Sequence, residues 1–179
     1  MSLSGHQSPV MGKDEWLTPP DILSKLGPFC LDPCSPIVRP WDTAAQHYHV
    51  NDNGLEQPWT GRVWCNPPFG QEAVKWLRRM AKHGNGIALI PARTETSMFY
   101  ECVWGAADAI CFIKGRPHFH HVTGERAAFN SGAPICLVAY GWENVYALRA
   151  SNLGVVLTIK TEPDNDDAQL AQSADKAEG

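Results

Sequence analysis

The residues best suited to chemistry are Asn66-Pro67-Pro68-Phe69, which directly follow the apolar run 63–65. The side-chain carbonyl of Asn66 and the main-chain carbonyl of Pro67 can accept hydrogen bonds, and prolines have no N–H to donate. Two such acceptors can take both hydrogens of a planar exocyclic amine, as in adenine or cytosine, and turn its lone pair towards a methyl donor. The ring of Phe69 can stack on the base. The tetrapeptide therefore predicts methylation of an amino group, although Asn-Pro-Pro after a strand is also an ordinary turn.

A second candidate group follows the apolar residues 29–31, at Asp32 in Leu31-Asp32-Pro33-Cys34. A carboxylate at this place can bind the ammonium group or the ribose hydroxyls of a cofactor, or it can simply form an Asp-Pro turn. Because no glycine-rich phosphate loop follows, we do not expect a nucleoside triphosphate or dinucleotide site. Pro33-Cys34 also matches the thiolate nucleophile of cytosine-5 methylation, but no partner residue for that chemistry is evident.

A basic segment, Lys114-Gly115-Arg116-Pro117-His118-Phe119-His120-His121, surrounds one aromatic ring. In a nucleic-acid complex Lys114 and Arg116 would contact phosphates, and Phe119 would stack on an unstacked base. Two other interpretations remain open, a solvated loop and a metal site that uses the histidines. The sequence places no third acidic or thiol ligand near them, so we predict no metal.

Composition places these residues in one domain of 179 residues with a formal net charge of −4. Residues 161–179 hold six acids and one base, whereas residues 1–160 hold 14 bases and 13 acids. We therefore predict a loose lead (1–13), a folded domain (14–160) and an acidic, disordered tail (161–179). A near-neutral body with an acidic tail is compatible with DNA binding through a local patch.

The chain has no apolar run of membrane-spanning length, and because residues 1–12 are polar we expect no signal peptide. Its six cysteines include no Cys-x-x-Cys pair. Those in apolar, strand-like runs, where a free thiol behaves as a small hydrophobe, are Cys30, Cys65, Cys111 and Cys136. We expect a reduced, cytoplasmic protein without structural zinc.

The elements that position the candidate residues follow from hydrophobic periodicity and from Gly and Pro punctuation. Helices are predicted at 21–26, 72–83, 97–107 and 144–150, and strands at 29–31, 62–65, 87–90, 109–113, 134–140 and 155–159. Thr18 is the expected N-cap of the first helix, and Thr94 or Thr96 that of the third. Residues 33–60 and 114–133 are expected to be irregular.

This alternation predicts an α/β fold with a mixed, mostly parallel sheet and helices on both faces. In such sheets ligands bind at the carboxyl ends of the strands. Asp32, Asn66 and Arg93 each follow a predicted strand, so we expect them to face one crevice. Arg93 is accordingly a candidate contact to phosphate.

Several segments together resemble the phage-type DNA N-6-adenine-methyltransferase (Dam) family, from about residue 14 to about residue 159. They are Asp14-Glu15-Trp16-Leu17-Thr18-Pro19-Pro20, Leu31-Asp32-Pro33-Cys34-Ser35-Pro36, Asp52-Asn53-Gly54-Leu55, Trp64-Cys65-Asn66-Pro67-Pro68-Phe69, Ile90-Pro91-Ala92-Arg93-Thr94 and Phe112-Ile113-Lys114-Gly115-Arg116. The resemblance implies S-adenosylmethionine as methyl donor and adenine in DNA as acceptor. It also implies a single, shortened Rossmann-like methyltransferase domain.

The resemblance further assigns roles to individual residues. Asn66 to Phe69 match the catalytic loop, and Phe119 is a candidate for a second aromatic face of the base pocket. The implied cofactor residues are Thr18 and Pro19 on the methionine side, Asp32, Cys34 and Asp52, the last bound to the ribose or to the adenine edge. The chain departs from larger relatives in having no glycine-rich turn after Asp32 and only about 30 residues between Asp32 and Asn66.

We therefore predict an adenine-N6 DNA methyltransferase that flips its target base out of the duplex and uses neither a metal nor a covalent intermediate. No separate target-recognition domain fits in this length, so selectivity would come from residues 33–60 and 114–133 or be low. The family analogy suggests bacteriophage or prophage origin, action in the host cytoplasm and a part in restriction–modification. The alternatives are methylation of cytosine N4 or of a protein glutamine amide, and a non-enzymatic DNA-binding module with the same fold.

Overall fold

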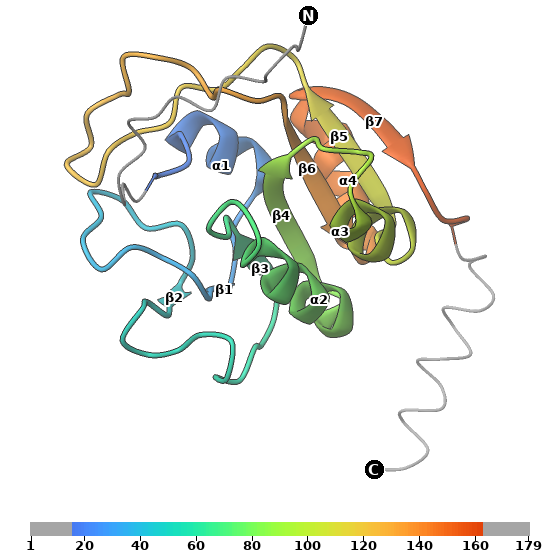
Figure 1. The fold of residues 1–179 in the computed structure, drawn as a ribbon, viewed down its shortest axis with the longest axis horizontal. Coiled ribbons are helices and arrows are strands. Elements are labelled where there is room, and N and C mark those ends of the chain that lie inside the picture. The colour runs from blue at the N-terminus through green and yellow to red at the C-terminus, as the bar shows by residue number, and fades with distance from the viewer. Residues whose placement is uncertain (1–15, 163–179) are drawn as a thin grey trace, which may run out of the picture.

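The computed structural model describes residues 16–162, which form one seven-stranded sheet with helices on both faces (Figure 1). The predicted lead, 1–13, and the tail from residue 163 onwards lie outside the described residues. Within the described range, no helix is long and apolar enough to cross a membrane.

The sheet has the strand order β2-β1-β3-β4-β6-β5-β7. Its strands are β1 (Leu31–Asp32), β2 (Gln46–His47), β3 (Val63–Cys65), β4 (Gly86–Pro91), β5 (Ala109–Ile113), β6 (Ile135–Tyr140) and β7 (Gly154–Thr158). Strands β2, β1, β3 and β4 pair in parallel, whereas β6 is antiparallel to both β4 and β5, and β7 is antiparallel to β5. The sheet is therefore mixed, as predicted, with β6 and β7 running against the other five strands.

The helices are α1 (Pro20–Leu26), α2 (Ala73–His83), α3 (Ser97–Phe99), which continues as the π-helical turn η1 (Tyr100–Trp104), and α4 (Trp142–Ser151). Helices α1 and α4 pack on one face of the sheet, and α2, α3 and η1 pack on the other (Figure 1). Along β4, Ile87 and Leu89 point to the first face, and Ala88 and Ile90 to the second. Both faces of this strand are buried, which explains its apolar run without alternation.

Three local predictions were wrong or incomplete. Thr18 is not an N-cap, because α1 begins at Pro20 and its N-cap is Pro19, which makes no side-chain bond. Strand β2 was missed inside the segment expected to be irregular, because its two residues are polar and pair only with β1. The third helix changes to a π turn and ends at Trp104, where the buried Tyr140 hydroxyl donates to the Cys102 carbonyl at 2.7 Å.

The cysteines also differ from expectation at one position. All six are free thiols, and Cys65, Cys111 and Cys136 are buried as their apolar surroundings suggested. Cys30 is exposed, because β1 begins one residue later, at Leu31. The prediction failed because one residue of register decides which face a side chain takes.

A buried polar link holds α4 against the start of β3. The Arg62 side chain donates from Nε to Asn144 Oδ1 at 2.7 Å and from Nη1 to the Pro28 carbonyl at 3.0 Å. Asn144, which has no exposed surface, donates to Asn85 Oδ1 at 2.9 Å and to the Tyr140 carbonyl at 2.7 Å. Burial lowers the pKa of the Arg62 guanidinium, so its hydrogen bonds replace lost water.

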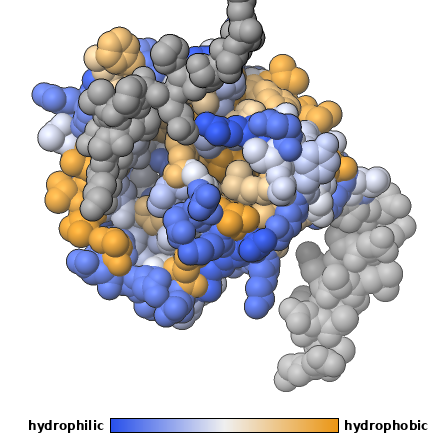
Figure 2. Space-filling view, in the orientation of Figure 1, coloured by the Kyte–Doolittle hydropathy of each residue, from blue (hydrophilic) through white to orange (hydrophobic). Residues whose placement is uncertain are grey.

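Where Figure 2 displays described residues, hydrophobic side chains form patches among hydrophilic ones. The large exposed apolar side chains come from distant parts of the chain, among them Val38, Val50, Phe129 and Val155. Single exposed hydrophobic residues are normal for a folded domain.

Candidate active site

The carboxyl ends of β1, β3 and β4 lie at one edge of the sheet, because these three strands are adjacent and parallel. Asp32 ends β1, Asn66 follows β3, and Arg93 follows the end of β4 at Pro91. These three residues therefore share one edge of the sheet, and that they face one crevice stays a prediction. Strand β5 runs in the same direction, so Lys114 and the segment after it leave the sheet at this edge too.

The loop after β3 is fixed by two hydrogen bonds from other parts of the chain. Asn66 donates from Nδ2 to the Trp16 carbonyl at 3.1 Å, and its own main-chain carbonyl accepts from the Cys34 thiol at 3.3 Å. Because Nδ2 is engaged, the amide has a defined orientation, and Oδ1 has no partner within residues 16–162. The Pro67 carbonyl likewise accepts no hydrogen bond from the described residues. Two neighbouring acceptors are therefore available.

Cys34 supports this loop as a thiol. Its sulfur lies 3.7 Å from the sulfur of Cys65, the last residue of β3. The Cys65 thiol and burial both raise the pKa of the Cys34 thiol well above its usual value. Cys34 is therefore protonated and can donate to the Asn66 carbonyl, and a thiolate nucleophile for cytosine-5 methylation is disfavoured.

The aromatic residue of the loop is exposed. Phe69 has 43% of its surface exposed, and Phe119, 6% exposed, lies edge-on to it with ring centroids 6.3 Å apart. The structure thus brings together the two rings that the sequence predicted for the base pocket. Because Phe119 is part of the buried core, it supports the Phe69 ring and does not offer a wide free face.

A short antiparallel pairing ties the segment before α1 to the basic segment after β5. Leu17 and His120 exchange both main-chain hydrogen bonds, at 2.8 and 3.0 Å. The Trp16 ring lies 4.6 Å from the His121 ring, and the Trp41 ring lies 5.2 Å from the His120 ring. This pairing places the Trp16 carbonyl where it meets the Asn66 side chain.

Several buried polar atoms around this pairing have no hydrogen-bond partner within the described residues. They are Trp16 Nε1, Thr18 Oγ1, Trp41 Nε1 and His120 Nδ1. Buried polar groups in folded proteins are almost always bonded, so such a cluster is expected where a ligand completes the site. Sequence reasoning missed Trp41 because a lone Trp gives no signal of what it faces, and it considered His120 only as part of the basic segment and as a possible metal ligand.

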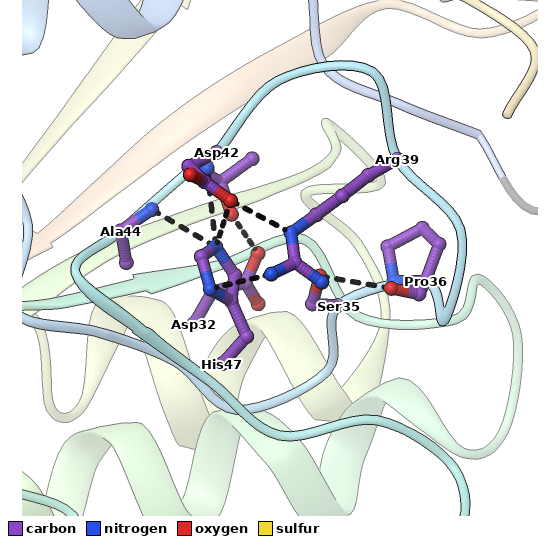
Figure 3. A network of polar contacts seen from close by, with 8 residues as sticks. Asp32, Ser35, Pro36, Arg39, Asp42, Ala44 and His47 are labelled. Atoms are coloured by element: carbon purple, nitrogen blue, oxygen red, sulfur yellow. Dashed lines mark hydrogen bonds and ion pairs between the residues drawn. The ribbon is translucent and has the colours of Figure 1, made fainter. Parts of the chain in front are cut away.

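Asp32 is buried within a network of polar contacts (Figure 3). Its carboxylate accepts from the Thr43 hydroxyl and, at 3.1 Å, from the Cys34 N–H. Burial raises the pKa of Asp32 from 3.8 to about 6, against the smaller lowering effects of these two donors and of the Arg39 charge. An ionised carboxylate here is therefore costly and is best satisfied by a nearby cation.

The rest of the network holds residues 33–45 over Asp32 (Figure 3). Arg39 donates to Asp42 at 3.1 Å and also contacts His47 Nδ1 at 3.0 Å. His47 Nε2 faces the N–H groups of Thr43 and Ala44 at 3.2 and 3.3 Å. Burial and, to a smaller extent, the Arg39 charge lower the pKa of His47, so its ring is held neutral.

Asp52 lies in a turn that packs on the same edge. Its carboxylate accepts from the His49 N–H at 2.9 Å. The turn is pressed against the loop after β1, since a Cβ on Gly54 would lie 1.9 Å from the Pro33 carbonyl oxygen. The turn that carries Asp52 thus lies against the residue that follows Asp32, but part of the hydrogen-bonding capacity of Asp52 is used by its own turn.

The family model for DNA N-6-adenine-methyltransferase (Dam) matches residues 5–168. The chain belongs to this family. It is accordingly a DNA methyltransferase that transfers a methyl group from S-adenosylmethionine to N6 of adenine, which decides among the amine targets that the sequence left open. Comparisons with curated proteins and with solved structures find no significant match.

The described part of the methyltransferase contains no group of three His, Cys, Asp or Glu side chains that could hold a metal ion. His118 instead donates from Nδ1 to the Ala127 carbonyl at 3.2 Å, which braces the basic segment. Lys114, Arg116 and Arg93 are exposed and form no ion pair with an acidic residue of the described range.

The residues at this edge of the sheet fit the cofactor. S-adenosylmethionine carries an ammonium group, a sulfonium and a carboxylate, and the site edge offers a buried carboxylate, Asp32, and a buried hydroxyl without a partner, Thr18. The raised pKa of Asp32 is the behaviour of a carboxylate that a cation would stabilise.

Proposed function

We propose that Asn66 and Pro67 hold the amino group of an adenine that has been flipped out of duplex DNA. The observation that carries this proposal is the hydrogen bond from Asn66 Nδ2 to the Trp16 carbonyl. It engages the donor end of the amide and leaves Oδ1 as an acceptor next to the free Pro67 carbonyl. A side chain free to rotate would present donor and acceptor in turn, whereas this one is preorganised.

The two acceptors act on the electronic state of the amine. The adenine amino nitrogen is a poor nucleophile because its lone pair is delocalised into the ring. Hydrogen bonds from its two N–H groups to Asn66 Oδ1 and to the Pro67 carbonyl favour a pyramidal nitrogen with a localised lone pair. The loop contributes position and fixed dipoles, which are the main sources of rate enhancement when no covalent intermediate forms.

Phe69 is the proposed stacking surface for the extruded base. Its exposed ring comes two residues after Pro67, and the ring of Phe119 fixes it from the side. The sequence suggested Phe119 as a second stacking face, and its burial favours the narrower role of a support. Extrusion is required because the target nitrogen is paired inside a duplex.

Thr18, Pro19, Asp32, Cys34 and Asp52 are the proposed cofactor residues, on a shortened Rossmann-like domain spanning residues 14–160. When bound, S-adenosylmethionine supplies an electrophilic methyl group. Asp32 would hold the ammonium group, and the Thr18 hydroxyl would bond to the carboxylate. Cys34 would act indirectly, since its thiol already holds the Asn66 carbonyl.

The proposed setting is the cytoplasm of a bacterial host, where both the DNA and the methyl donor are found. A phage or prophage origin and a role in restriction–modification are parts of this proposal that rest on the family analogy alone.

The test is methylation of duplex DNA with labelled S-adenosylmethionine, followed by digestion and mass spectrometry of the nucleosides. Asn66→Ala should lower the yield of N6-methyladenine by at least about 100-fold, the typical cost of removing one preorganised polar group from an active site. Cofactor affinity, measured by calorimetry, should stay within a few-fold of wild type. Gln71→Ala is the matched control, because it removes an exposed amide from the same region.

Two results would contradict the assignment. If Asn66→Ala kept near-normal activity, the amide would not hold the amine. If it lost cofactor binding as strongly as activity, Asn66 would belong to the cofactor site.

A further inference from the structure

A basic groove opens beside the active site. It is a cavity of about 740 Å³ lined by residues of α1, of the segment after β5 and of the turn that joins α4 to β7. The side chains that give it its charge are Lys25, Lys114, Arg116 and Arg126, and His118 and His120 also line it. Asp21 is the one acid in its lining. The groove therefore collects positive charge from two elements that are about 90 residues apart in the sequence.

The cations of the groove form no ion pair within the described structure. Residues 16–162 contain 13 Lys and Arg side chains. Five of them form ion pairs, and Arg62 and Arg79 bond to side-chain or main-chain oxygens inside the protein. The other six form no ion pair within this range, namely Lys25, Lys82, Arg93, Lys114, Arg116 and Arg126, although Arg116 donates to the Gly132 carbonyl at 3.5 Å. Of these six, four line this one cavity.

The sign of the charge decides between ligands. S-adenosylmethionine carries a net positive charge, and a groove with four fixed cations and one acid would repel it. The carboxylate that suits this cofactor, Asp32, does not line the groove. A polyanion gains from every one of the four cations and releases counterions on binding, which makes a nucleic-acid backbone the natural occupant.

The groove is next to the catalytic loop. His118 and His120 line it, and Phe119 between them turns inward to meet Phe69. On the other wall, Pro19 lines the groove directly after the buried Thr18. A strand of DNA lying in the groove would thus pass within one residue layer of the loop that handles the base.

The walls of the groove are held in place by the fold. Lys25 projects from α1, whose Ile22, Leu23 and Leu26 are buried in the core. The opposite wall is fixed where the Lys114 N–H donates to the Leu153 carbonyl at 2.9 Å and where Leu17 pairs with His120. A preformed site loses little entropy when it binds.

We propose that the basic groove binds the phosphodiester backbone of the DNA strand that carries the target adenine, with Lys25 of α1 and Arg126 as phosphate contacts. The proposal rests on the proposed function of the catalytic loop, and it adds the direction in which the DNA leaves the active site. Lys25 is outside the segment for which the sequence suggested DNA contact.

The test measures binding of a fluorescently labelled duplex by anisotropy over a range of salt concentrations. Lys25→Gln and Arg126→Gln should each weaken binding several-fold. Each should also reduce the slope of log Kd against log salt by about 0.9, the value for one lost phosphate contact on B-DNA. Lys82→Gln, which removes an exposed and unpaired cation from α2 on the other face of the sheet, should leave the slope unchanged.

Cofactor affinity, measured by calorimetry, should be the same in all these variants, which shows that the site edge is intact. Wild-type slopes for both groove variants would overturn the proposal, as would an equal loss of slope in Lys82→Gln.

The groove and the catalytic loop can fail separately. Asn66→Ala should bind DNA with the wild-type salt slope. If the groove variants lose DNA binding but Asn66→Ala still produces N6-methyladenine at the wild-type level, the groove proposal stands and the loop assignment falls. If methylation depends on Asn66 but the groove variants bind normally, the groove proposal alone is refuted.

Discussion

Replacing Asp32 by Asn removes a buried carboxylate whose ionisation the fold disfavours. Burial raises the pKa of Asp32 from 3.8 to about 6. Each pKa unit corresponds to about 1.36 kcal/mol, so the folded protein spends about 3 kcal/mol in keeping this group ionised at high pH. Between the two pKa values the folded state binds the proton more tightly than the unfolded state does. The free energy of unfolding therefore falls as the pH rises through this window.

The expected result is a pH-dependent difference between Asp32→Asn and wild type. Asn keeps the shape of the side chain and an oxygen for the Thr43 hydroxyl, but it does not titrate. Integration with the two pKa values shows that about 1.4 of these 3 kcal/mol of unfolding free energy are lost between pH 5 and pH 8. The variant should gain that much stability relative to wild type over this range, which is a relative rise in Tm of about 3–6 °C for a domain of this size.

The assay is urea unfolding of both proteins at pH 5, 6, 7 and 8, with Asp21→Asn as a control for loss of an exposed carboxylate. If the free energy of unfolding changed with pH in the same way in Asp32→Asn and in wild type, the reasoning would be refuted. Such a result would mean that water reaches Asp32. Cofactor binding gives a second readout. Asp32→Asn should weaken S-adenosylmethionine at pH 8, and the wild-type affinity should fall as the pH drops below about 6, where protonation of Asp32 removes its charge.

Two further predictions concern the base and the core. Phe69→Ala should lower the rate of adenine methylation about 10- to 100-fold, since stacking of a base on an aromatic side chain contributes about 1–3 kcal/mol; Phe69→Tyr, which keeps the ring, should retain most of the activity in the same assay. Asn144→Ala should lower the free energy of unfolding in urea by about 1–3 kcal/mol, because it leaves the buried Arg62 guanidinium without its Nε partner. A loss below about 1 kcal/mol would show that water replaces that partner.

Much of the fold could be predicted from the sequence because its signals are local. Helix α2 differs from the predicted 72–83 by one residue, and β5 matches the predicted 109–113. Both have an uninterrupted apolar pattern and clear boundaries; Gly84, for example, ends α2 in the left-handed conformation. The shared edge of Asp32, Asn66 and Arg93 was predictable as well, because it follows from strand direction alone.

The remaining features depend on contacts between distant residues. Asn144 lies 82 positions from Arg62 in the sequence, and the residues around it do not predict that the two side chains form a hydrogen bond. Thr18 matches the residue type of an N-cap, but its hydroxyl is buried beside α1 and points to no described partner. The groove could not be seen either, because Lys25 is a lone lysine on a short helix until the fold brings the segment after β5 beside it.

The short segment between Asp32 and Asn66 explains how this methyltransferase manages without a glycine-rich turn. In dinucleotide-binding α/β folds the glycines of such a turn let the main chain approach the phosphates of the ligand closely. Here residues 33–45 cover the end of β1, and side chains do the positioning, since Thr43 bonds to Asp32 and His47 holds the main chain of Thr43. The turn at Gly54 then closes against Pro33. A loop held by its own side chains can be short, which is why about 30 residues suffice to connect the proposed cofactor carboxylate to the catalytic loop.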